Sequence, residues 1–464
     1  MRTNFILNTD SYKASHFKQY PLHTSEVVSY IEPRTGGDFD KCVFFGLQMF
    51  LKEYLSQPVT KEDVDEAEAF FTGHGEPFNR EGWDYIVNML GGKLPVEIVA
   101  VPEGTVVPTG NVVVQVRNTD PKCFWLTSYV ETALLRAVWY PTTVATLSWH
   151  CRQIIYDALV RSSDDPEGQI SFKLHDFGSR GVSSNESAGL GGAGHLVNFM
   201  GSDTVEGVRY ANYYYKAGMA AFSIPAAEHS TITSWGKAGE RDAYENMIKQ
   251  FGGKGKLVAV VSDSYDLDHA VDKLWGGELR KMVLEMGGTL VVRPDSGDPA
   301  TIVLRTVRKL GEAFGTKRNA KGYLVLNPAV RVIQGDGINI RSIGEILNTL
   351  MNAGYSAENV AFGMGGQLLQ GVNRDTMRWA MKCNQITVDG VVREVFKNPA
   401  TDPSKASKKG ALALIRMNGR LITVPEASLQ LKEAAENVLR PVFRNGDLFN
   451  ETTFDEVRKL ARSA

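Results

Sequence analysis

The stretch Gly287-Gly-Thr-Leu-Val-Val-Arg-Pro-Asp-Ser-Gly-Asp298 decides how the fold is interpreted. Its β-branched and apolar run, residues 289–292, is typical of a strand buried on both faces. Arg293 then supplies a planar fork of donors, and Asp295 and Asp298 supply carboxylates. An anion-binding Arg beside Asp at a strand's end indicates a phosphorylated substrate carrying Mg²⁺. The alternative is a helix N-cap with a surface salt bridge, and this stretch alone does not decide between them.

The same order of apolar strand, Gly/Asp/Ser loop and helix repeats from about residue 170 onward. The other strand candidates are 170–178, 196–200, 220–225, 257–261, 330–333 and 360–362. Residues 242–251 and 301–314 predict helices between them. About seven βα units favour a parallel barrel over an open doubly wound sheet. A parallel barrel has its active site on the loops after its strands, where the unusual residues of this chain lie.

The N-terminal region carries a different pattern. Residues 96–116 predict three strands separated by Pro-Glu-Gly and Pro-Thr-Gly turns. Residues 126–139 and 143–160 predict two helices, with Pro141 between them.

The C-terminal region is also rich in strand signals. Residues 386–392 predict a hairpin with an Asp-Gly turn, and two further strand candidates follow. We therefore predict one discontinuous β-rich α+β domain, residues 1–160 together with 385–464, beside a barrel of residues 161–384.

Composition limits the function. The 464 residues are 43% hydrophobic and 22% charged, as in an ordinary globular protein large enough for two domains. A net charge of −2 gives no reason to predict a nucleic-acid or membrane partner. No apolar run predicts a signal peptide or a membrane span. The scattered cysteines predict neither a zinc site nor disulfides: Cys42, Cys123, Cys151 and Cys383. The sequence predicts a cytoplasmic enzyme.

Two glycine-rich stretches do not predict a nucleotide fold. Residues 189–194 match GxGxxG, but no strand precedes them, so we interpret them as small residues for close helix packing. Residues 252–256 lack the spacing and the Ser or Thr of a phosphate-binding P-loop. The lysines of residues 405–409 are interpreted as a solvated loop unless other evidence places phosphate there.

The rim of the predicted barrel carries the reactive residue types. His229 fits a nucleophile or an acid/base group oriented by Glu228 or Asp263, and a structural capping histidine is the alternative. Phe177 can stack on a flat ring, and Arg180 can hold phosphate.

Glycines on the same rim predict close approach of a ligand. Asp336, between two glycines, can reach a sugar diol, and Gly363 to Gly366 can line phosphate with backbone N–H groups.

Together these motifs resemble the nicotinamide phosphoribosyltransferases, of the type II phosphoribosyltransferase family. The resemblance rests on HDFGSRG, GSDT, PAAEHST, VSDSYD, RPDSGDP, IQGDG and FGMGG, and it extends over essentially the whole chain. It implies an irregular (β/α) barrel and a homodimer with both active sites at the subunit interface. It also implies transfer of 5-phosphoribosyl from phosphoribosyl pyrophosphate to nicotinamide, with Mg²⁺, and with ATP as co-substrate.

The resemblance also implies residue roles. Phe177 and the partner subunit's Tyr12 would stack on the pyridine ring, Asp203 would accept from the carboxamide, and His229 would be phosphorylated by ATP. Base and ribose contacts would come from Arg180, Arg293 and Asp295. The residues implied for phosphate and ribose hydroxyls are Gly335, Asp336, Gly365, Gly366, Arg374, Lys382, Lys397 and Lys405.

Asp203 also carries the physical argument for the substrate. A carboxylate accepts from an amide NH₂ but repels the carboxylate of nicotinate, so nicotinamide is favoured over the nicotinate alternative. Two departures from the family pattern, Ser179 in place of Tyr and Ala380 in place of Ser, bear on affinity rather than on reaction class. A barrel lyase is a further alternative that needs a lysine inside the barrel, and Lys173 is the nearest candidate.

Overall fold

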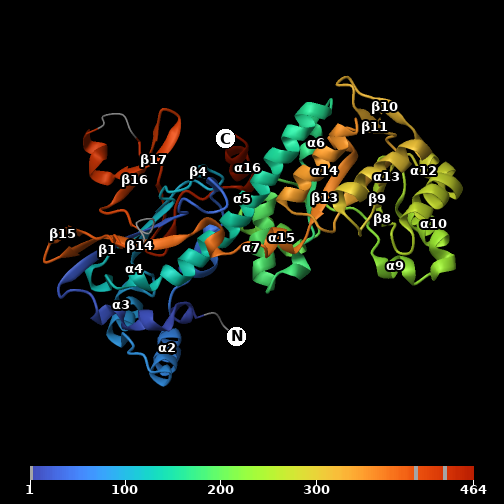
Figure 1. Cartoon of the computed structure of the whole chain (residues 1–464). Helices are drawn as coiled ribbons and strands as arrows, with labels where there is room; N and C mark the ends of the chain where they lie inside the picture. Colours follow the sequence, from blue (N-terminus) through green and yellow to red (C-terminus); the bar gives the residue numbers. More distant parts are fainter. Residues whose placement is uncertain (1–3, 402–405, 432–435, 464) are drawn as a thin grey trace. The chain divides into compact units, whose positions relative to one another are not determined.

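The computed structural model describes residues 4–401, 406–431 and 436–463 (Figure 1). The chain divides into two compact units. Unit 1 comprises residues 1–146, 213–217 and 373–464, and unit 2 comprises residues 147–212 and 218–372. The sequence predicted boundaries near residues 160 and 384. The first observed boundary lies inside a continuous helix, where no change of composition marks it.

That helix, α5 (Glu131–Ser162), corrects the prediction of two helices separated by a proline. Pro141 lies inside it. Proline removes one backbone N–H and usually kinks or ends a helix. Two threonine hydroxyls near the proline donate to carbonyls of the preceding turn. Thr143 Oγ1 donates to Trp139 O at 2.5 Å, and Thr146 Oγ1 donates to Thr142 O at 2.6 Å. The proline ring packs against Gly46, where a Cβ atom would lie 2.4 Å from Pro141 Cγ.

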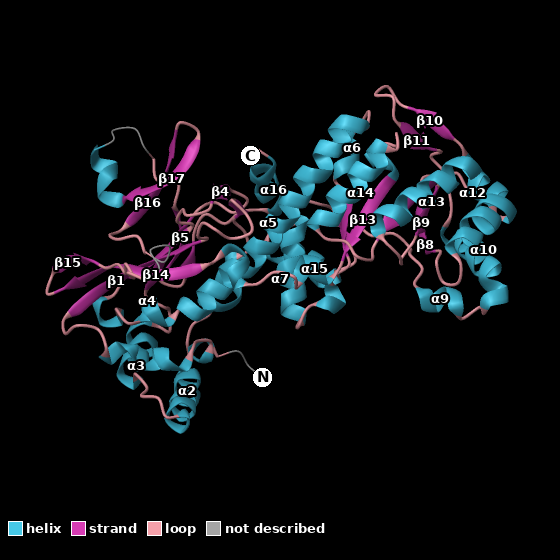
Figure 2. Ribbon diagram, in the orientation of Figure 1, coloured by secondary structure: helices cyan, strands magenta, loops and turns pink. Residues whose placement is uncertain are grey.

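Unit 2 is built on a parallel sheet of six strands within the described residues (Figure 2). In spatial order they are β7 (Gly201–Ser202), β6 (Leu174–Asp176), β13 (Val360–Met364), β12 (Val330–Gln334), β9 (Thr289–Arg293) and β8 (Leu257–Val261). The middle of β9 is buried, which agrees with its uncharged apolar sequence. A separate hairpin is formed by β10 (Thr316–Arg318) and β11 (Leu324–Leu326).

The two outer strands of this sheet are linked through the segment 220–227. Phe222 forms a parallel bridge to Gly201 beside β7, and Ala226 forms one to Ala259 in β8. The backbone bonds include Phe222 N to Met200 O at 2.8 Å and Ala259 N to Pro225 O at 3.0 Å. The segment predicted as a strand thus contributes only isolated bridges, and these make the ring of strands an irregular barrel.

Helices cover the outside of the parallel strands, as α10, α12, α13 and α14 illustrate in Figure 2. The helices that begin in unit 2 are α6 (Pro166–Ile170), α7 (Asn185–Leu196), α8 (Val205–Tyr214), α9 (His229–Thr233), α10 (Glu240–Phe251), α11 (Leu267–His269), α12 (Arg280–Glu285), α13 (Pro299–Phe314), α14 (Ile340–Asn352) and α15 (Gly366–Leu369). The glycines of residues 189–194 lie in α7, and a Cβ atom on Gly192 would come within 2.8 Å of Gly207 Cα in α8. Their interpretation as packing residues is confirmed.

Two further strand predictions in unit 2 were wrong. Of the predicted strand 170–178, residues 170–173 form the end of α6 and the turn after it, and β6 covers only Leu174–Asp176. Residues 196–200 complete α7 and the turn after it, and strand β7 begins only at Gly201. The run is apolar because it is buried, and a short buried run does not distinguish a strand from the end of a buried helix.

Unit 1 contains a mixed set of antiparallel sheets. Its largest sheet has the order β15 (Val391–Glu394), β14 (Ala380–Val388), β1 (Thr24–Glu32), β5 (Val114–Asn118), β3 (Val96–Ala100), β18 (Arg440–Arg444) and β19 (Asp447–Leu448). Smaller sheets pair β2 (Lys41–Val43) with β4 (Val106–Pro108), and β16 (Leu412–Met417) with β17 (Arg420–Pro425). The helices are α1 (Leu47–Phe50), α2 (Lys61–His74), α3 (Arg80–Leu90), α4 (Leu126–Tyr129) and α16 (Phe454–Arg462).

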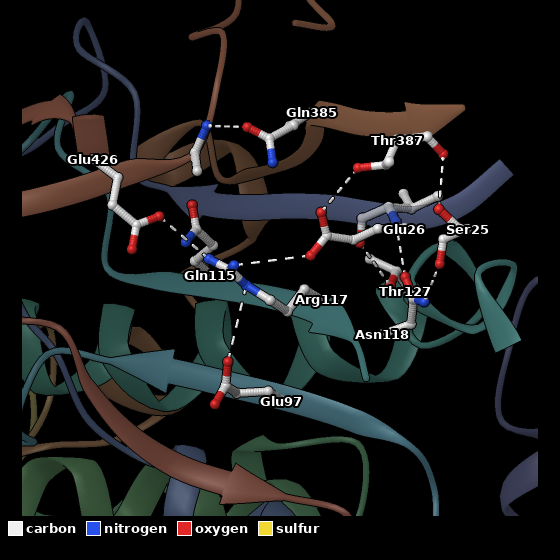
Figure 3. A network of polar contacts seen from close by, with 12 residues as sticks. Ser25, Glu26, Glu97, Gln115, Arg117, Asn118, Thr127, Gln385, Thr387 and Glu426 are labelled. Atoms are coloured by element: carbon white, nitrogen blue, oxygen red, sulfur yellow. Dashed lines mark hydrogen bonds and ion pairs between the residues drawn. The ribbon is translucent and has the colours of Figure 1, made fainter. Parts of the chain in front are cut away.

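The predicted hairpin between β14 and β15 is confirmed. Asp389 and Gly390 have φ of 50° and 72°, which the paired turn residues of a tight hairpin require. Charged side chains also fix the middle of the sheet (Figure 3). Arg117 of β5 contacts Glu26, Glu97 and Glu426 at 3.9, 3.9 and 3.4 Å. Glu26 lies on β1 and Glu97 on β3, on either side of β5, so the charge of Arg117 favours this order of the three strands.

Candidate active site

The predicted site residues of unit 2 all follow the carboxyl ends of parallel strands or the bridging segment. Phe177 and Arg180 follow β6, Asp203 follows β7, and His229 begins α9 after the bridge at Ala226. The remaining residues follow β8, β9, β12 and β13: Asp263, Arg293 (the last residue of β9), Asp295, Gly335, Asp336, Gly365 and Gly366. Because parallel strands end at the same rim, residues far apart in sequence meet there.

A cavity of about 930 Å³ runs along the interior of this ring of strands. At the carboxyl rim it is lined by Phe177, Arg180, Asp203 and Arg293, and by Ser179. Its interior wall is apolar, with Ala259, Val291 and Ile333 packed against Ile224 and Ala361. An apolar cavity with a few polar groups at its mouth suits an aromatic ring.

Glycines leave room for the ring of Phe177. A Cβ atom on Gly363 would lie 1.9 Å from Phe177 Cε2. A Cβ atom on Gly335 would lie 3.3 Å from Asp295 Oδ1, 3.5 Å from Phe177 Cε2 and 3.6 Å from Arg293 Nε. The backbone of Gly335 therefore lies directly beside the aromatic ring and the charged pair.

Asp295 and Asp298, the two carboxylates of the stretch 287–298, have different functions. Arg293 donates to Asp295 through Nε at 3.0 Å and Nη2 at 2.6 Å, and its guanidinium lies 5.9 Å from the centre of the Phe177 ring. Asp298 instead caps α13 by accepting from Thr301 N at 2.9 Å, and hydrogen bonding to the side chain and then to the backbone of Thr301 lowers the pKa of Asp298. The capping alternative is thus confirmed for Asp298, whereas Asp295 is part of a forked ion pair.

Asp203 is held by a residue that the sequence did not single out. Ser223 Oγ, in the bridging segment, donates to Asp203 Oδ1. The backbone of Asp203 donates to Asp176 O at 2.9 Å, and Asp176 Oδ1 accepts from Gly178 N at 2.7 Å. Burial raises the pKa of Asp176 to about 7. Asp176 thus connects the turn that carries Phe177 with the loop that carries Asp203.

His229 lies beside Asp263, one of the two orienting residues considered from sequence. Its Nε2 is 3.0 Å from Asp263 Oδ1, and the imidazole is 48% exposed whereas the Asp263 side chain is 7% exposed. Glu228 instead belongs to the cap of α9 and accepts from Ser230. An ionised carboxylate only accepts, so Nε2 carries the proton of a neutral ring and Nδ1 has the free lone pair.

Lys173, the lysine required by the lyase alternative, lies at the other end of the cavity. It precedes β6, and its Nζ donates to Glu358 O at 2.7 Å. Burial lowers the pKa of Lys173 to about 7. The lysine therefore lies at the amino ends of the strands, whereas the predicted site residues gather at the carboxyl ends.

The other predicted residues belong to unit 1. Tyr12 is 54% exposed and packs edge-on against His16 at 5.2 Å between ring centres. Arg374 lies in a short 3₁₀ turn, and Lys397 is exposed after β15. Lys405 lies outside the described residues.

Lys382, on β14, is the centre of a group of cations in unit 1. Burial lowers its pKa, with a raising contribution from Glu131 and lowering contributions from Arg34, Lys397 and Lys13. Lys13 is paired with Glu131 at 2.8 Å. We refer to Arg34, Lys382 and Lys397 as the cation cluster.

Arg34 was not predicted from sequence. It follows β1, and its Nε and Nη2 are buried without a hydrogen-bond partner in the described part of the chain. Its contact with Glu32 is long, at 4.0 Å. An arginine shortly after a strand and next to Thr-Gly-Gly was the only available signal. Buried guanidinium donors of this kind suit a phosphate ligand.

The described residues contain neither a cluster of metal-ligating side chains nor a helix that could cross a membrane. No group of three or more His, Cys, Asp or Glu side chains could hold a metal ion. No described helix is both long enough and apolar enough to cross a membrane.

The family models show that this barrel belongs to a class of phosphoribosyl-transferring enzymes. The chain belongs to the nicotinate phosphoribosyltransferase (NAPRTase) family, whose model matches residues 172–447. Residues 4–98 match the model of the nicotinamide phosphoribosyltransferase N-terminal domain.

Curated relatives match nearly the full chain. A nicotinamide phosphoribosyltransferase of Xanthomonas campestris pv. campestris is 54% identical over 99% of this chain and 98% of its own length. One of Acinetobacter baylyi is 33% identical over 99% of this chain and 97% of its own length. The chain is thus a phosphoribosyltransferase, as the sequence predicted.

Solved structures share the fold. A nicotinate-nucleotide pyrophosphorylase from Pyrococcus furiosus has a TM-score of 0.63 at 15% identity, covering 100% of this chain and 96% of that one. The human nicotinic acid phosphoribosyltransferase has a TM-score of 0.56 at 17% identity, covering 98% and 93%. The predicted class, an irregular barrel with a β-rich α+β part, is confirmed.

Proposed function

We propose that the enzyme transfers 5-phosphoribosyl from phosphoribosyl pyrophosphate to nicotinamide, giving nicotinamide mononucleotide and pyrophosphate for NAD salvage. Asp203 is the observation that carries the choice of base. One of its carboxylate oxygens accepts from Ser223, and the carboxylate lines the cavity mouth near Phe177. A carboxamide NH₂ can donate to it, whereas the carboxylate of nicotinate is repelled. The relatives at 54% and 33% identity are named for the same substrate.

The reaction is a displacement at the anomeric carbon of the ribose. The lone pair of the pyridine nitrogen forms the new C–N bond, and the C–O bond to pyrophosphate breaks with its electron pair going to pyrophosphate. Positive charge develops on the sugar in between. Asp295, beside Arg293 and the backbone of Gly335, is suited to stabilise that charge.

Phosphate groups need cations and backbone donors. The rim glycines Gly365 and Gly366 are proposed to bind the ribose phosphate, and Asp336 the ribose hydroxyls. Arg374 and the cation cluster in unit 1 are proposed to bind phosphate groups across the subunit interface. Lys405 is proposed on resemblance alone. We propose that Mg²⁺ enters with the substrate pyrophosphate, whose oxygens hard cations prefer.

The homodimer implied by the resemblance provides a way to combine both sets of residues. In this proposal the partner subunit's Tyr12 stacks on the base opposite Phe177, and the cation cluster serves the active site of the partner. The exposure of Tyr12 supports its availability for such a contact. A cytoplasmic location is proposed with it, in keeping with the free state of all four cysteines.

ATP is proposed as co-substrate through phosphorylation of His229. The Nδ1 lone pair attacks the γ-phosphorus, the bond to the β-phosphate oxygen breaks, and ADP leaves with its electron pair. Asp263 holds the Nε2 proton and fixes the ring during this step. Hydrolysis of the phosphohistidine then favours product formation.

Base preference tests the proposal directly. Wild-type enzyme with phosphoribosyl pyrophosphate and Mg²⁺ is expected to prefer nicotinamide over nicotinate. Asp203→Asn removes the charge, so kcat/KM for nicotinamide should fall about 10- to 100-fold, corresponding to about 1.5–3 kcal/mol for a charged hydrogen bond. The preference over nicotinate should shrink with it.

The matched control is Asp242→Asn, since Asp242 is an exposed residue of α10 paired with Arg241. It should leave both rates unchanged. Faster turnover of nicotinate than of nicotinamide by the wild type would favour the alternative activity, that of a nicotinate phosphoribosyltransferase.

A further inference from the structure

Two polar contacts and one peptide bond connect His229 with the Arg293–Asp295 pair. His229 Nε2 lies 3.0 Å from Asp263 Oδ1, and Ser296 Oγ donates to Asp263 Oδ2 at 2.5 Å. The next residue back along the chain is Asp295, held by the fork of Arg293 at 3.0 and 2.6 Å. The series joins three separate parts of the chain: the first residue of α9, the loop after β8 and the loop after β9.

Asp263 is the rigid part of this series. Its side chain is only 7% exposed, and each of its two oxygens has one of these partners. The two oxygens belong to one planar group, so any rotation that changes the contact with His229 also moves the contact with Ser296. A hydrogen bond to a nearly buried carboxylate is also stronger than one between exposed groups.

The turn that carries Ser296 is fixed at both of its ends. Asp295 is held by Arg293 on one side, and Asp298 caps α13 on the other. Between them Gly297 has a φ of 92°, a conformation suited to glycine. The side chain of Ser296 thus links this turn to Asp263 in the loop after β8, and through Asp263 to His229.

We propose that Ser296 is a positioning residue that couples the state of His229 to the Arg293–Asp295 pair. The inference deepens the proposed function, because it rests on phosphorylation of His229. A phosphoryl group on Nδ1 brings up to about two negative charges close to Asp263. The carboxylate adjusts, Ser296 moves with it, and the turn carrying Asp295 changes its position against the ribose. Coupling between two sites has to act in both directions, so bound substrate also changes the reactivity of His229.

A purely structural role would produce a different result. An exposed serine hydroxyl in a turn contributes to stability to the same extent with and without ATP. A coupling role changes the ratio of KM values measured with and without ATP.

The test compares wild type, Ser296→Ala and Ser296→Thr. The KM for phosphoribosyl pyrophosphate is measured with and without ATP, and phosphohistidine is quantified by intact mass and acid lability. In wild type we expect ATP to lower the KM by at least about fivefold, the low end of typical coupling factors. In Ser296→Ala the ratio should fall to about one while phosphohistidine still forms, and Ser296→Thr should keep both because it retains the hydroxyl.

Ser264→Ala is the matched control. Ser264 lies next to Asp263 on the same loop, and its buried Oγ has no hydrogen-bond partner among the described residues. Its KM ratio should equal that of wild type.

Each other outcome overturns the coupling role. An ATP response of Ser296→Ala equal to that of wild type would show that the hydroxyl transmits nothing. Loss of phosphohistidine in Ser296→Ala would assign Ser296 to the phosphoryl step instead. A wild type with neither phosphohistidine nor an ATP response would refute the ATP part of the proposed function, and the coupling with it.

Discussion

The barrel cavity of unit 2 and the cation cluster of unit 1 recognise ligands by different physical means. At the carboxyl rim of the barrel, two carboxylates are already held by neighbours: Asp203 by Ser223, and Asp295 by Arg293. Such fixed groups discriminate between ligands by where the ligand carries its donors and acceptors, because a hydrogen bond weakens steeply away from its preferred geometry. In the cluster, Arg34 has buried nitrogens without partners in the described chain, and the pKa of Lys382 is lowered by burial. Cations gathered in this way attract any phosphate-rich ligand and discriminate little.

The largest expected effect comes from mixing variants of the two regions. Phe177→Ala in the cavity and Lys382→Ala in the cluster should each be nearly inactive alone. If each active site combines the cavity of one subunit with the cluster of the other, a mixed dimer has one intact site. Equal mixing after dissociation and reassociation should restore about a quarter of wild-type activity, since about half of the dimers are mixed.

Steady-state rates of the mixture check this, with size-exclusion chromatography to confirm exchange. Activity that stays at the level of the two separate variants would contradict a shared site.

Removal of the unpredicted arginine should give the next largest effect. Arg34→Ala removes charged donors, so KM for phosphoribosyl pyrophosphate should rise about 100-fold while KM for nicotinamide changes little. Arg34→Lys should recover only part of the loss, because lysine lacks the planar fork. Initial rates over a range of both substrates separate the two constants. An equal rise of both constants would mean that Arg34 supports the fold rather than the phosphate.

Asp176 should give a smaller, pH-dependent effect on stability. Its folded pKa of about 7 lies above the ordinary value of 3.8, so the native state binds the extra proton between these values. Stability therefore falls as pH rises through this window, by about 2 kcal/mol between pH 5 and pH 7. Asp176→Asn should remove this component, measured as free energy of unfolding in urea at each pH. A variant with the same pH dependence as wild type would refute the assignment.

The smallest effect is expected at Ala380, where the family pattern has serine. Ala380 lies two residues before Lys382 on β14, so both side chains point to the same face of the sheet. Ala380→Ser adds one hydroxyl on the side of the cluster and should lower KM for phosphoribosyl pyrophosphate about two- to tenfold. Base preference should not change, and a changed preference would contradict the separation of the two regions.

The sequence predicted the parts of the molecule that follow local rules. Apolar strands followed by Gly, Asp and Ser correctly placed the barrel rim, and the Asp-Gly turn correctly placed the hairpin at residues 389–390. The failures come from tertiary packing. Pro141 lies inside α5, where its ring packs against Gly46 from a distant part of the sequence. The pattern could not separate Asp298, a helix cap, from Asp295, an ion-pair partner, because the difference depends on where Arg293 points.

Site residues were missed for the same reason. Ser223 and Arg34 carry no motif of their own, and each acquires its role from a partner or an environment far away in sequence. Their detection requires the fold, because only the fold shows which polar atoms face one another.

The order of strands in unit 1 has a consequence for synthesis on the ribosome. Strand β1 pairs with β14, so the first long strand made waits for residues about 350 positions later. All of unit 2 is translated in between, and its strands β6 to β13 are complete before residue 373 emerges. The barrel is therefore expected to fold first on the nascent chain, while the N-terminal segment keeps an open strand edge. Such an edge is a target for chaperones and for misassembly between neighbouring chains on one messenger RNA.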